Sequence, residues 1–254
     1  MNTKQAQIDQ MVRTLANSRN TVVVTGAGIS TEAGIPDFRG KNGIYRKMGE
    51  DRVMTIININ TFNSSPRLFY EFYNQYFIFP PVAPSKAHYV LAEMEGKGRI
   101  KGIITQNIDG LHEKAGSRRV VAVHGNAEKY VCTNRDCGEV YSRAQIQEQG
   151  VVIPTCDHCR TILKPDVILF GEPIKCFTDA QEMIVGARTL LVIGSSLTVY
   201  PLAGFVKAFS TIYQDLLIIN QGPTQLDHAA LVKIDGAHTG DTLEEINHLL
   251  DRCG

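Results

Sequence analysis

Four cysteines stand in two close pairs, spaced C-x4-C and then C-x2-C, in the middle of the chain. They are Cys132, Cys137, Cys156 and Cys159, and 18 residues separate the two pairs. Two close thiolate pairs suit a tetrahedral zinc ion in a ribbon-like module. A catalytic zinc needs an open position, and four thiolates leave none, so the pattern predicts one structural zinc. The alternative, two disulfides, is disfavoured because the polar N-terminus carries no secretory signal.

A glycine turn follows a short valine run near the N-terminus, in the stretch TVVVTGAGISTEAGIPDFRG that begins at Thr21. The β-branched run predicts a buried strand. Gly26 and Gly28 allow a tight turn and a close approach to a ligand. The residues from Ile29 to Ala33 then start a helix, whose N-terminal amides favour an anion such as pyrophosphate. This predicts a dinucleotide-type site, although Thr31 stands at the third glycine of G-x-G-x-x-G.

A compact charged and aromatic run, Pro36-Asp37-Phe38-Arg39, continues the same stretch between two glycines. A plain connector would not need Asp, Phe and Arg in succession, so the run is a candidate part of the ligand site. The alternative is a solvated loop with a local pair between Asp37 and Arg39.

Five predicted strands each finish on a glycine or a polar residue. The strands at 22–25, 100–105, 120–123, 190–193 and 216–219 end at Gly26, Gln106, His124, Gly194 and Asn220. In an open parallel sheet, ligands bind beyond the carboxyl ends of the strands. The pattern therefore predicts an α/β fold with one nucleotide-sized cleft along one sheet edge.

Three polar residues at this edge could carry out chemistry. A neutral imidazole at His124 could serve as a general base near pH 7, against the alternative of a satisfied core histidine. Asn107 and Asp109 can hold ribose hydroxyls or a carboxamide. Alternatively they form an Asx-type turn that caps a helix at 110–114, and both roles can hold at once.

The alternation of strands and helices is interrupted by two segments, at 41–84 and 126–163. Within the first segment, residues 41–52 are polar and predict an exposed loop, and the aromatic spacing at 62–79 predicts a helix that packs through one face. We therefore predict a Rossmann-like parallel-sheet domain from 1–40, 85–125 and 164–254. A helical insertion with a cofactor loop would occupy 41–84, and a zinc-binding module 126–163. The last two would make up a smaller domain.

The composition excludes several classes of protein. The 26 basic and 26 acidic residues give a net charge of zero, which argues against a general nucleic-acid binder. No segment approaches the roughly 20 apolar residues of a membrane span. The expected location is the cytoplasm, with no membrane partner.

Together these segments resemble the sirtuin family of NAD-dependent protein deacylases. The resemblance rests on GAGIS, GIPDFRG, Gln106-Asn107-Ile108-Asp109, His124-Gly125, the four cysteines, Phe170-Gly171-Glu172, Gly194-Ser195-Ser196 and Asn220. These come in the family's order and cover nearly the whole chain. The resemblance implies removal of acetyl groups from protein lysines with NAD as co-substrate, giving nicotinamide, deacetylated lysine and O-acetyl-ADP-ribose.

The resemblance also implies roles for individual residues. His124 would take a proton from the ribose hydroxyls, with Asn107 and Asp109 beside it in the catalytic site. The NAD site would comprise Gly26, Ala27, Gly28, Thr31, Asp37, Phe38, Arg39, Gln106, Asn107, Ile108, Asp109, His124, Gly194, Ser195, Ser196, Asn220 and Thr239. Acetylated proteins or peptides would bind to Val167, Phe170 and Gly171 as an added strand.

One residue that differs from a pattern found in part of the family predicts which acyl group this chain prefers. Relatives specialised for acidic acyl chains carry Tyr-x-x-Arg on the helix of the first insertion. Here the matching residues are Tyr73 and Tyr76, so the expected pocket lacks its cation. An unpaired buried carboxylate is costly, so acetyl is expected to be preferred over succinyl.

Three other functions use parts of the same pattern. A protein ADP-ribosyltransferase would share the NAD site and is the main alternative; His124 favours the deacylase, whose 2′-hydroxyl step needs a base. A zinc-containing dehydrogenase is disfavoured by Thr31 and by the closed metal site. A nucleic-acid-binding zinc ribbon is disfavoured because residues 126–163 hold four basic and five acidic side chains.

Overall fold

A parallel sheet forms the larger part of the computed structural model, which describes residues 3–40, 43–210, 215–235 and 238–253. Its six strands lie in the order β3-β2-β1-β7-β8-β9, and every neighbouring pair is parallel. They are β1 (Thr21–Thr25), β2 (Gly102–Thr105), β3 (Val120–Ala122), β7 (Thr189–Ile193), β8 (Asp215–Ile219) and β9 (Val232–Ile234). Numbered within this sheet alone, the order is 3-2-1-4-5-6, the order of a doubly wound dinucleotide-binding sheet. The predicted Rossmann-like fold is confirmed.

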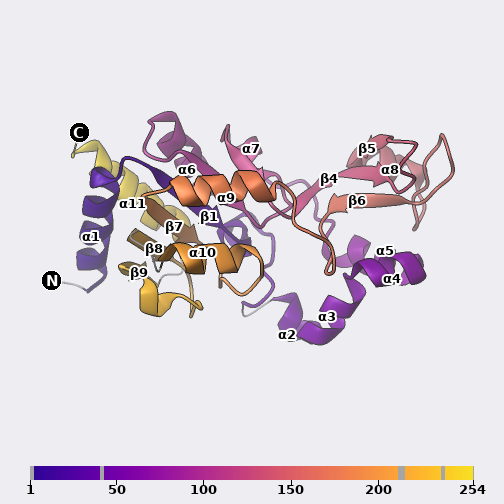
Figure 1. Ribbon diagram of the computed structural model, residues 1–254, viewed down its shortest axis with the longest axis horizontal. Helices are drawn as coiled ribbons and strands as arrows, with labels where there is room; N and C mark the ends of the chain where they lie inside the picture. Colours follow the sequence, from indigo (N-terminus) through magenta and orange to yellow (C-terminus); the bar gives the residue numbers. More distant parts are fainter. Residues whose placement is uncertain (1–2, 41–42, 211–214, 236–237, 254) are drawn as a thin grey trace.

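Helices cover both faces of this sheet (Figure 1). The first face carries α1 (Thr3–Asn17), α6 (Lys86–Gly96) and α11 (Thr239–Asp251), and the second carries α9 (Phe177–Gly186) and α10 (Leu202–Ser210). Successive residues of a strand point to opposite faces. Val23 accordingly packs in the first core, whereas Val22 and Val24 pack in the second. Burial on both faces explains why the strand is a continuous apolar run.

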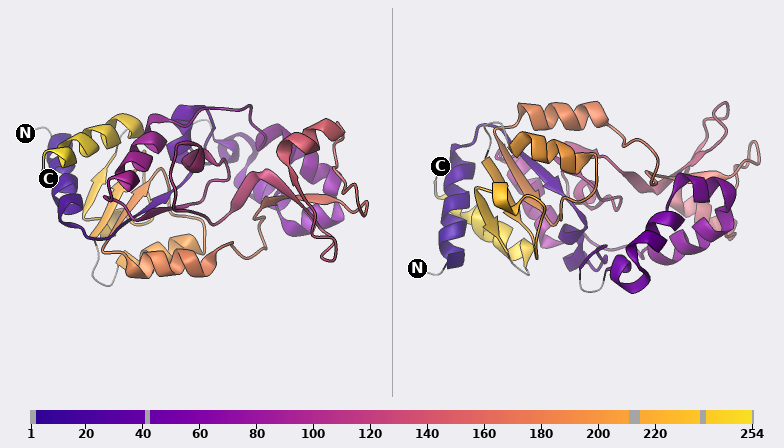
Figure 2. Two further views of the ribbon diagram at one scale, coloured as in Figure 1. Left: turned by 90° about the horizontal axis from the view of Figure 1, so that it is seen from above. Right: turned by 60° about the horizontal axis from the view of Figure 1, so that its bottom comes forward.

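A second, three-stranded antiparallel sheet lies at the far end of the elongated molecule (Figure 1). It comprises β4 (Gly125–Cys132), β5 (Val140–Ser142) and β6 (Leu163–Val167), with α8 (Arg143–Gln149) beside it. The helices α4 (Ile59–Ser64) and α5 (Pro66–Tyr76) pack against this small sheet, and α2 (Ile44–Met48) and α3 (Glu50–Ile56) pack against α5 (Figure 2). Phe69 and Tyr70 of α5 share a core with Tyr130 of β4 and Leu163 of β6. The helical insertion and the cysteine module therefore pack into one smaller unit.

Two local predictions differ from the structure. Residues 41–42 lie outside the described residues, but α2 and α3 replace the loop expected up to residue 52. Each has five to seven residues, too few to show an apolar period. The helix expected at 29–33 is the 3₁₀-helix η1 (Ala27–Ala33). The two remaining short elements are α7 (Leu111–Lys114) and η2 (Asp227–Ala229).

Within the described residues, no helix combines the length and the apolar character that crossing a bilayer requires.

Two histidines are buried side by side under the carboxyl edge of the large sheet. The rings of His88 and His112 lie 4.7 Å apart, centroid to centroid. The Ser85 backbone N–H donates to His88 Nδ1, and His112 Nε2 lies 2.9 Å from Thr25 Oγ1. His88 Nε2 and His112 Nδ1 are buried without a partner among the described residues. Burial lowers the pKa of His88 to about 4, although the Asp109 carboxylate opposes the shift. Burial and the neighbouring His88 lower the pKa of His112 to about 3.

This pair predicts acid sensitivity of the fold. Both folded pKa values lie below the unfolded value of about 6.5, so the unfolded chain binds more protons as pH falls from about 6.5 towards 4. The stability that each neutral histidine contributes is therefore complete above about pH 6.5 and is lost below it. Between pH 7 and pH 5, we expect the free energy of unfolding to fall by about 2 kcal/mol per histidine.

Urea unfolding at the two pH values measures this loss. His112→Asn should lower the stability at pH 7 but reduce the fall between pH 7 and pH 5 by about 2 kcal/mol. His248→Asn, at an exposed position on α11, is the control and should keep the wild-type fall. The same fall in His112→Asn as in the wild type would contradict the assignment to the buried pair.

Candidate functional site

The turns after β1 and β7 touch through backbone alone. Gly28 N–H donates to Gly194 O at 2.8 Å, and Gly26 N–H donates to Ile193 O at 3.1 Å. A Cβ on Gly26 would lie 2.8 Å from Gly194 O, and one on Gly28 would lie 2.7 Å from Gly194 Cα. Both glycines are thus required by packing. The close approach that these two glycines allow is therefore made to the backbone of the turn after β7.

Gln106 connects the end of β2 with the end of β7. Ser195 Oγ donates to Gln106 Oε1 at 2.8 Å. Gln106 Nε2 is buried and has no partner among the described residues. Buried polar groups are rarely left unpaired, so this amide marks a place for a polar ligand atom. Asn220, at the end of β8, is also buried and donates to the carbonyls of Gln221 and Gly222.

His124 follows β3 and is held by a backbone carbonyl. Its Nδ1 lies 2.9 Å from Gln106 O. A carbonyl can only accept, so Nδ1 carries the hydrogen and the neutral ring has its lone pair on Nε2. Burial lowers the pKa of His124, and the bond to Gln106 only partly opposes this. The imidazole is therefore neutral at pH 7, with one nitrogen able to accept a proton.

Asn107 and Asp109 are joined by Ser30, a residue absent from the predicted site. Asn107 Nδ2 donates to Ser30 Oγ at 3.0 Å, and Ser30 Oγ donates to Asp109 Oδ2 at 2.7 Å. Asp109 Oδ1 accepts the Leu111 N–H at the start of α7, as expected for the Asx-type turn. Ser30 is the last residue of the GAGIS motif, so the sequence already pointed to this position. The motif alone does not show which groups the Ser30 hydroxyl bonds to.

The run at residues 37–39 faces the helical insertion. Phe38 packs on Tyr45 of α2, with ring centroids 5.4 Å apart. Arg39 pairs with Glu50 of α3 and lies over the Tyr45 ring at 4.8 Å. Asp37 accepts the Gly40 N–H at 2.9 Å. The local pair considered between Asp37 and Arg39 is therefore replaced by a bond from Arg39 to a distant carboxylate.

The remaining predicted cofactor residues lie in η1, after β2, after β7 and at the start of α11. Ala27 is half-buried in η1, and exposed Thr31 donates from Oγ1 to Gly28 O at 2.9 Å. Ile108 packs against the core of the smaller unit. Ser196 Oγ lies 2.9 Å from Thr198 Oγ1. Thr239 is buried at the start of α11, beside Gly240, whose N–H donates to Glu32 of η1.

The predicted peptide-binding residues follow β6, next to His124. The N–H of Ile168 donates to His124 O at 2.9 Å. Phe170 already uses both backbone groups, with Ile57 O and Ile59 N–H, each at 3.0 Å. By contrast, no hydrogen bond joins the Ile168 carbonyl or the Gly171 backbone to any described residue. Ile168 was missed because the sequence does not show which backbone groups remain unpaired.

The four cysteines meet in one cluster. Their sulfur atoms all lie within 4.8 Å of one another. The Cys132–Cys159 and Cys137–Cys156 sulfur distances are 3.4 and 3.6 Å. Ligands of a tetrahedral zinc at 2.3 Å lie roughly 3.8 Å apart, so the cluster fits a Zn²⁺ with four thiolates.

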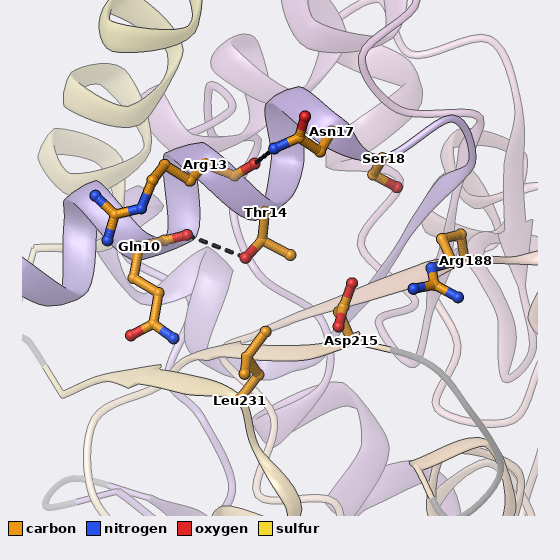
Figure 3. Close-up of a pocket in the computed structure, with 8 residues that line it drawn as sticks. All are labelled: Gln10, Arg13, Thr14, Asn17, Ser18, Arg188, Asp215 and Leu231. Carbon is orange, nitrogen blue, oxygen red and sulfur yellow. Dashed lines mark hydrogen bonds between the residues drawn. The ribbon is translucent and has the colours of Figure 1, made fainter.

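A polar pocket of about 300 Å³ lies at the opposite, amino-terminal edge of the large sheet (Figure 3). Its lining comes from α1 and the starts of β7, β8 and β9, and comprises Gln10, Arg13, Thr14, Asn17, Ser18, Arg188, Asp215 and Leu231. None of the predicted site residues lies in it.

The sheet and the cysteine cluster define an α/β protein with a Rossmann-like sheet and a metal module. The model of the Sir2 family matches residues 26–201. A Thermotoga maritima protein named NAD-dependent protein deacetylase is 39% identical over 246 residues, covering 94% of this chain and 96% of that protein. An Archaeoglobus fulgidus protein named NAD-dependent protein deacylase 2 is 40% identical over 245 residues, covering 94% of each. The chain belongs to the Sir2 family.

Solved structures agree with this membership. One described as "Structural Basis for the Mechanism and Regulation of Sir2 Enzymes" is similar with a TM-score of 0.88 and 38% identity, covering 98% of this chain and 100% of the other. Another, a Sir2–p53 peptide–NAD⁺ complex, has a TM-score of 0.83 and 35% identity, covering 96% of this chain and 98% of the other.

The metal cluster predicts one zinc per chain. Cys156→Ser or Cys132→Ser should remove the zinc and unfold the smaller unit around β4–β6, because structural zinc supplies folding energy outright. Elemental analysis of freshly purified protein gives the zinc content, and limited proteolysis reports unfolding. Cys176→Ser, at an exposed cysteine outside the cluster, is the matched control and should retain zinc. Zinc-free wild-type protein that is fully folded would refute the prediction.

Proposed function

We propose that this chain is an NAD-dependent protein-lysine deacetylase in which His124 is the general base. The observation that carries the assignment is the His124 tautomer: Nδ1 is fixed on Gln106 O, so the lone pair is on Nε2. Membership of the Sir2 family and relatives named NAD-dependent protein deacetylase support the reaction. The products are nicotinamide, deacetylated lysine and O-acetyl-ADP-ribose.

The strand ends fit NAD. The buried, unpartnered Gln106 Nε2 offers a donor where a polar ligand would bind. NAD would be held along the carboxyl edge, with Gly194, Ser195, Ser196 and Asn220 towards its phosphate and adenosine end. When bound, NAD supplies the ADP-ribose that accepts the acetyl group. Asn107 and Asp109, which are joined through Ser30, would orient polar groups of the bound NAD.

The role of His124 is to take a proton from a ribose hydroxyl at Nε2. A base works best when its deprotonated form dominates at the working pH. Burial lowers the pKa of His124, so the neutral form is the main one at pH 7. Because Gln106 O holds Nδ1, the ring does not need to change tautomer before Nε2 accepts the proton.

The acetylated peptide would bind as an added strand beside β6. The Ile168 carbonyl and the backbone of Gly171 have no partner among the described residues, so they can pair with a peptide. Val167 and Phe170 would line the same segment. Backbone pairing suits peptides of varied sequence, and the neutral net charge gives no preference for nucleic acid.

The domain division that accompanies this function is 1–40, 85–125 and 164–254 for NAD, 41–84 for the helical insertion and 126–163 for zinc. The separate cores on the two faces of the large sheet and in the smaller unit support this division, except that Val167 and Leu169, beyond the boundary at 163, pack in the core of the smaller unit. β6 crosses the last boundary, so the proposed peptide segment would lie at the junction of the two units.

His124→Ala tests the proposed base. The variant should lose at least about 90% of the deacetylation rate, since general-base catalysis typically contributes 10²–10⁴-fold, while NAD still binds. Mass spectrometry of an acetyl-lysine peptide with and without NAD measures the reaction, and calorimetry measures NAD binding. His248→Ala, at an exposed position, is the control. More than about a tenth of wild-type turnover in His124→Ala would exclude the assignment. Transfer of label from NAD to protein, without O-acetyl-ADP-ribose, would instead identify an ADP-ribosyltransferase.

The acyl preference is tested on α5. Tyr73 is buried, while Tyr76 packs on Phe72 in a tilted arrangement with ring centroids 4.8 Å apart. With no cation at position 76, acetyl-lysine should be a better substrate than succinyl-lysine. kcat/KM on one peptide with either acyl group, in the wild type and Tyr76→Arg, measures the preference. Tyr76→Arg should raise kcat/KM for the succinyl-lysine peptide. A wild-type kcat/KM for succinyl-lysine that equals or exceeds the value for acetyl-lysine would contradict the prediction.

A further inference from the structure

The segment between β6 and α9 is held without regular secondary structure. β6 ends at Val167, and the following residues form a turn in which Gly171 has a φ of 91°. Glu172 N–H donates to Leu169 O at 3.0 Å, and the Glu172 carboxylate accepts the Leu169 N–H at 2.9 Å. The turn from Leu169 to Glu172 is therefore closed on itself by both the backbone and the side chain of Glu172.

Lys164 fastens this turn to β6. Its Nζ lies 2.9 Å from Glu172 Oε2 and donates to Val167 O at 2.6 Å. The side chains of Lys164 and Glu172 are 13% and 22% exposed, so water screens the pair only in part. Burial lowers the pKa of Lys164, and the facing Glu172 carboxylate opposes the shift. One ammonium group thus joins the last carbonyl of β6 to the carboxylate that closes the turn.

We propose that Lys164 and Glu172 are positioning residues for the acylated peptide. Their ion pair fixes the turn that presents the unpaired Ile168 carbonyl and the Gly171 backbone. The inference rests on the proposed function, because it concerns how the peptide substrate of that reaction is held. Neither side chain needs to touch the reacting atoms, so neither is a catalytic residue.

The consequence of breaking the pair should be local. Phe170 stays tied to Ile57 and Ile59 by its own backbone bonds, so the segment cannot leave the helical insertion. The imidazole of His124 is held by Gln106 O, and the segment reaches His124 only through the backbone bond from the Ile168 N–H, so the base keeps its orientation. The bonds that join Ser195 to Gln106, and Ser30 to Asn107 and Asp109, include no residue from 164 to 172. Peptide affinity should therefore fall while turnover and NAD affinity remain.

Two variants break the pair and two test its specificity. Lys164→Met removes the ammonium group, and Glu172→Gln keeps the shape but removes the charge. Lys164→Arg keeps the charge and the donors and should rescue binding. Lys175→Met is the matched control, because Lys175 also pairs with a β6 residue, Asp166, but its side chain makes no hydrogen bond or ion pair with the turn among the described residues.

Steady-state kinetics and peptide binding are measured on all five zinc-loaded proteins. In Lys164→Met and Glu172→Gln, KM for an acetyl-lysine peptide should rise about tenfold or more, the size of a lost charge-assisted hydrogen bond. kcat and KM for NAD should stay within about threefold, the pattern of lost uniform binding. Anisotropy of a fluorescent acetyl-lysine peptide should show the same loss of affinity without turnover. Lys164→Arg and Lys175→Met should match the wild type.

Three results would overturn the inference. These are parallel rises in the KM values for peptide and NAD, an unchanged peptide affinity with a lowered Tm, and a wild type that does not bind the peptide. A wild type that binds the peptide but releases no acetyl group with NAD overturns the proposed function instead. In that case the anisotropy of the variants still decides whether the pair positions the peptide.

Discussion

The arrangement of the candidate site depends on the contact between Gly28 and Gly194. Their backbones join through a hydrogen bond of 2.8 Å, and neither position has room for a Cβ. This contact locks the turn after β1 onto the turn after β7. It places Ser30 over the end of β2, where Ser30 reaches Asn107, and it leaves Ser195 within reach of Gln106. A side chain at either glycine would separate the turns and both polar links with them.

From this contact, hydrogen bonds lead to the base. Ser195 holds the Gln106 side chain, and the Gln106 carbonyl holds His124 Nδ1. A carboxylate in place of that carbonyl would favour the imidazolium and raise its pKa. A neutral carbonyl fixes the tautomer without adding a charge, so burial dominates and the pKa stays lowered. The site thereby orients its base and keeps it able to accept a proton at pH 7.

The parts of this arrangement that sequence could predict are those written as local patterns. Five apolar runs that end in glycine or polar residues gave the parallel sheet, and the cysteine spacing gave the metal cluster. Contacts between distant segments were not predictable. Arg39 was considered beside Asp37 but pairs with Glu50 of α3. This pair could not be predicted because α2 and α3 are too short to show an apolar period in the sequence. The unpaired carbonyl of Ile168 was also invisible, since backbone pairing is set by tertiary structure.

β4 connects the cysteine cluster with the base, because it ends at Cys132 and begins at Gly125, the residue after His124. At one end of the β4–β6 pair, Cys132 stands opposite Leu163; at the other, Gly125 stands opposite Val167. The register shifts between these ends, which marks a β-bulge or irregularity in the ladder. β4 has eight residues and spans roughly 25 Å. Beyond the shift, the Ile168 N–H donates to His124 O. The cysteine cluster and the base therefore lie at opposite ends of one strand, too far apart for the metal to take part directly in the proton transfer.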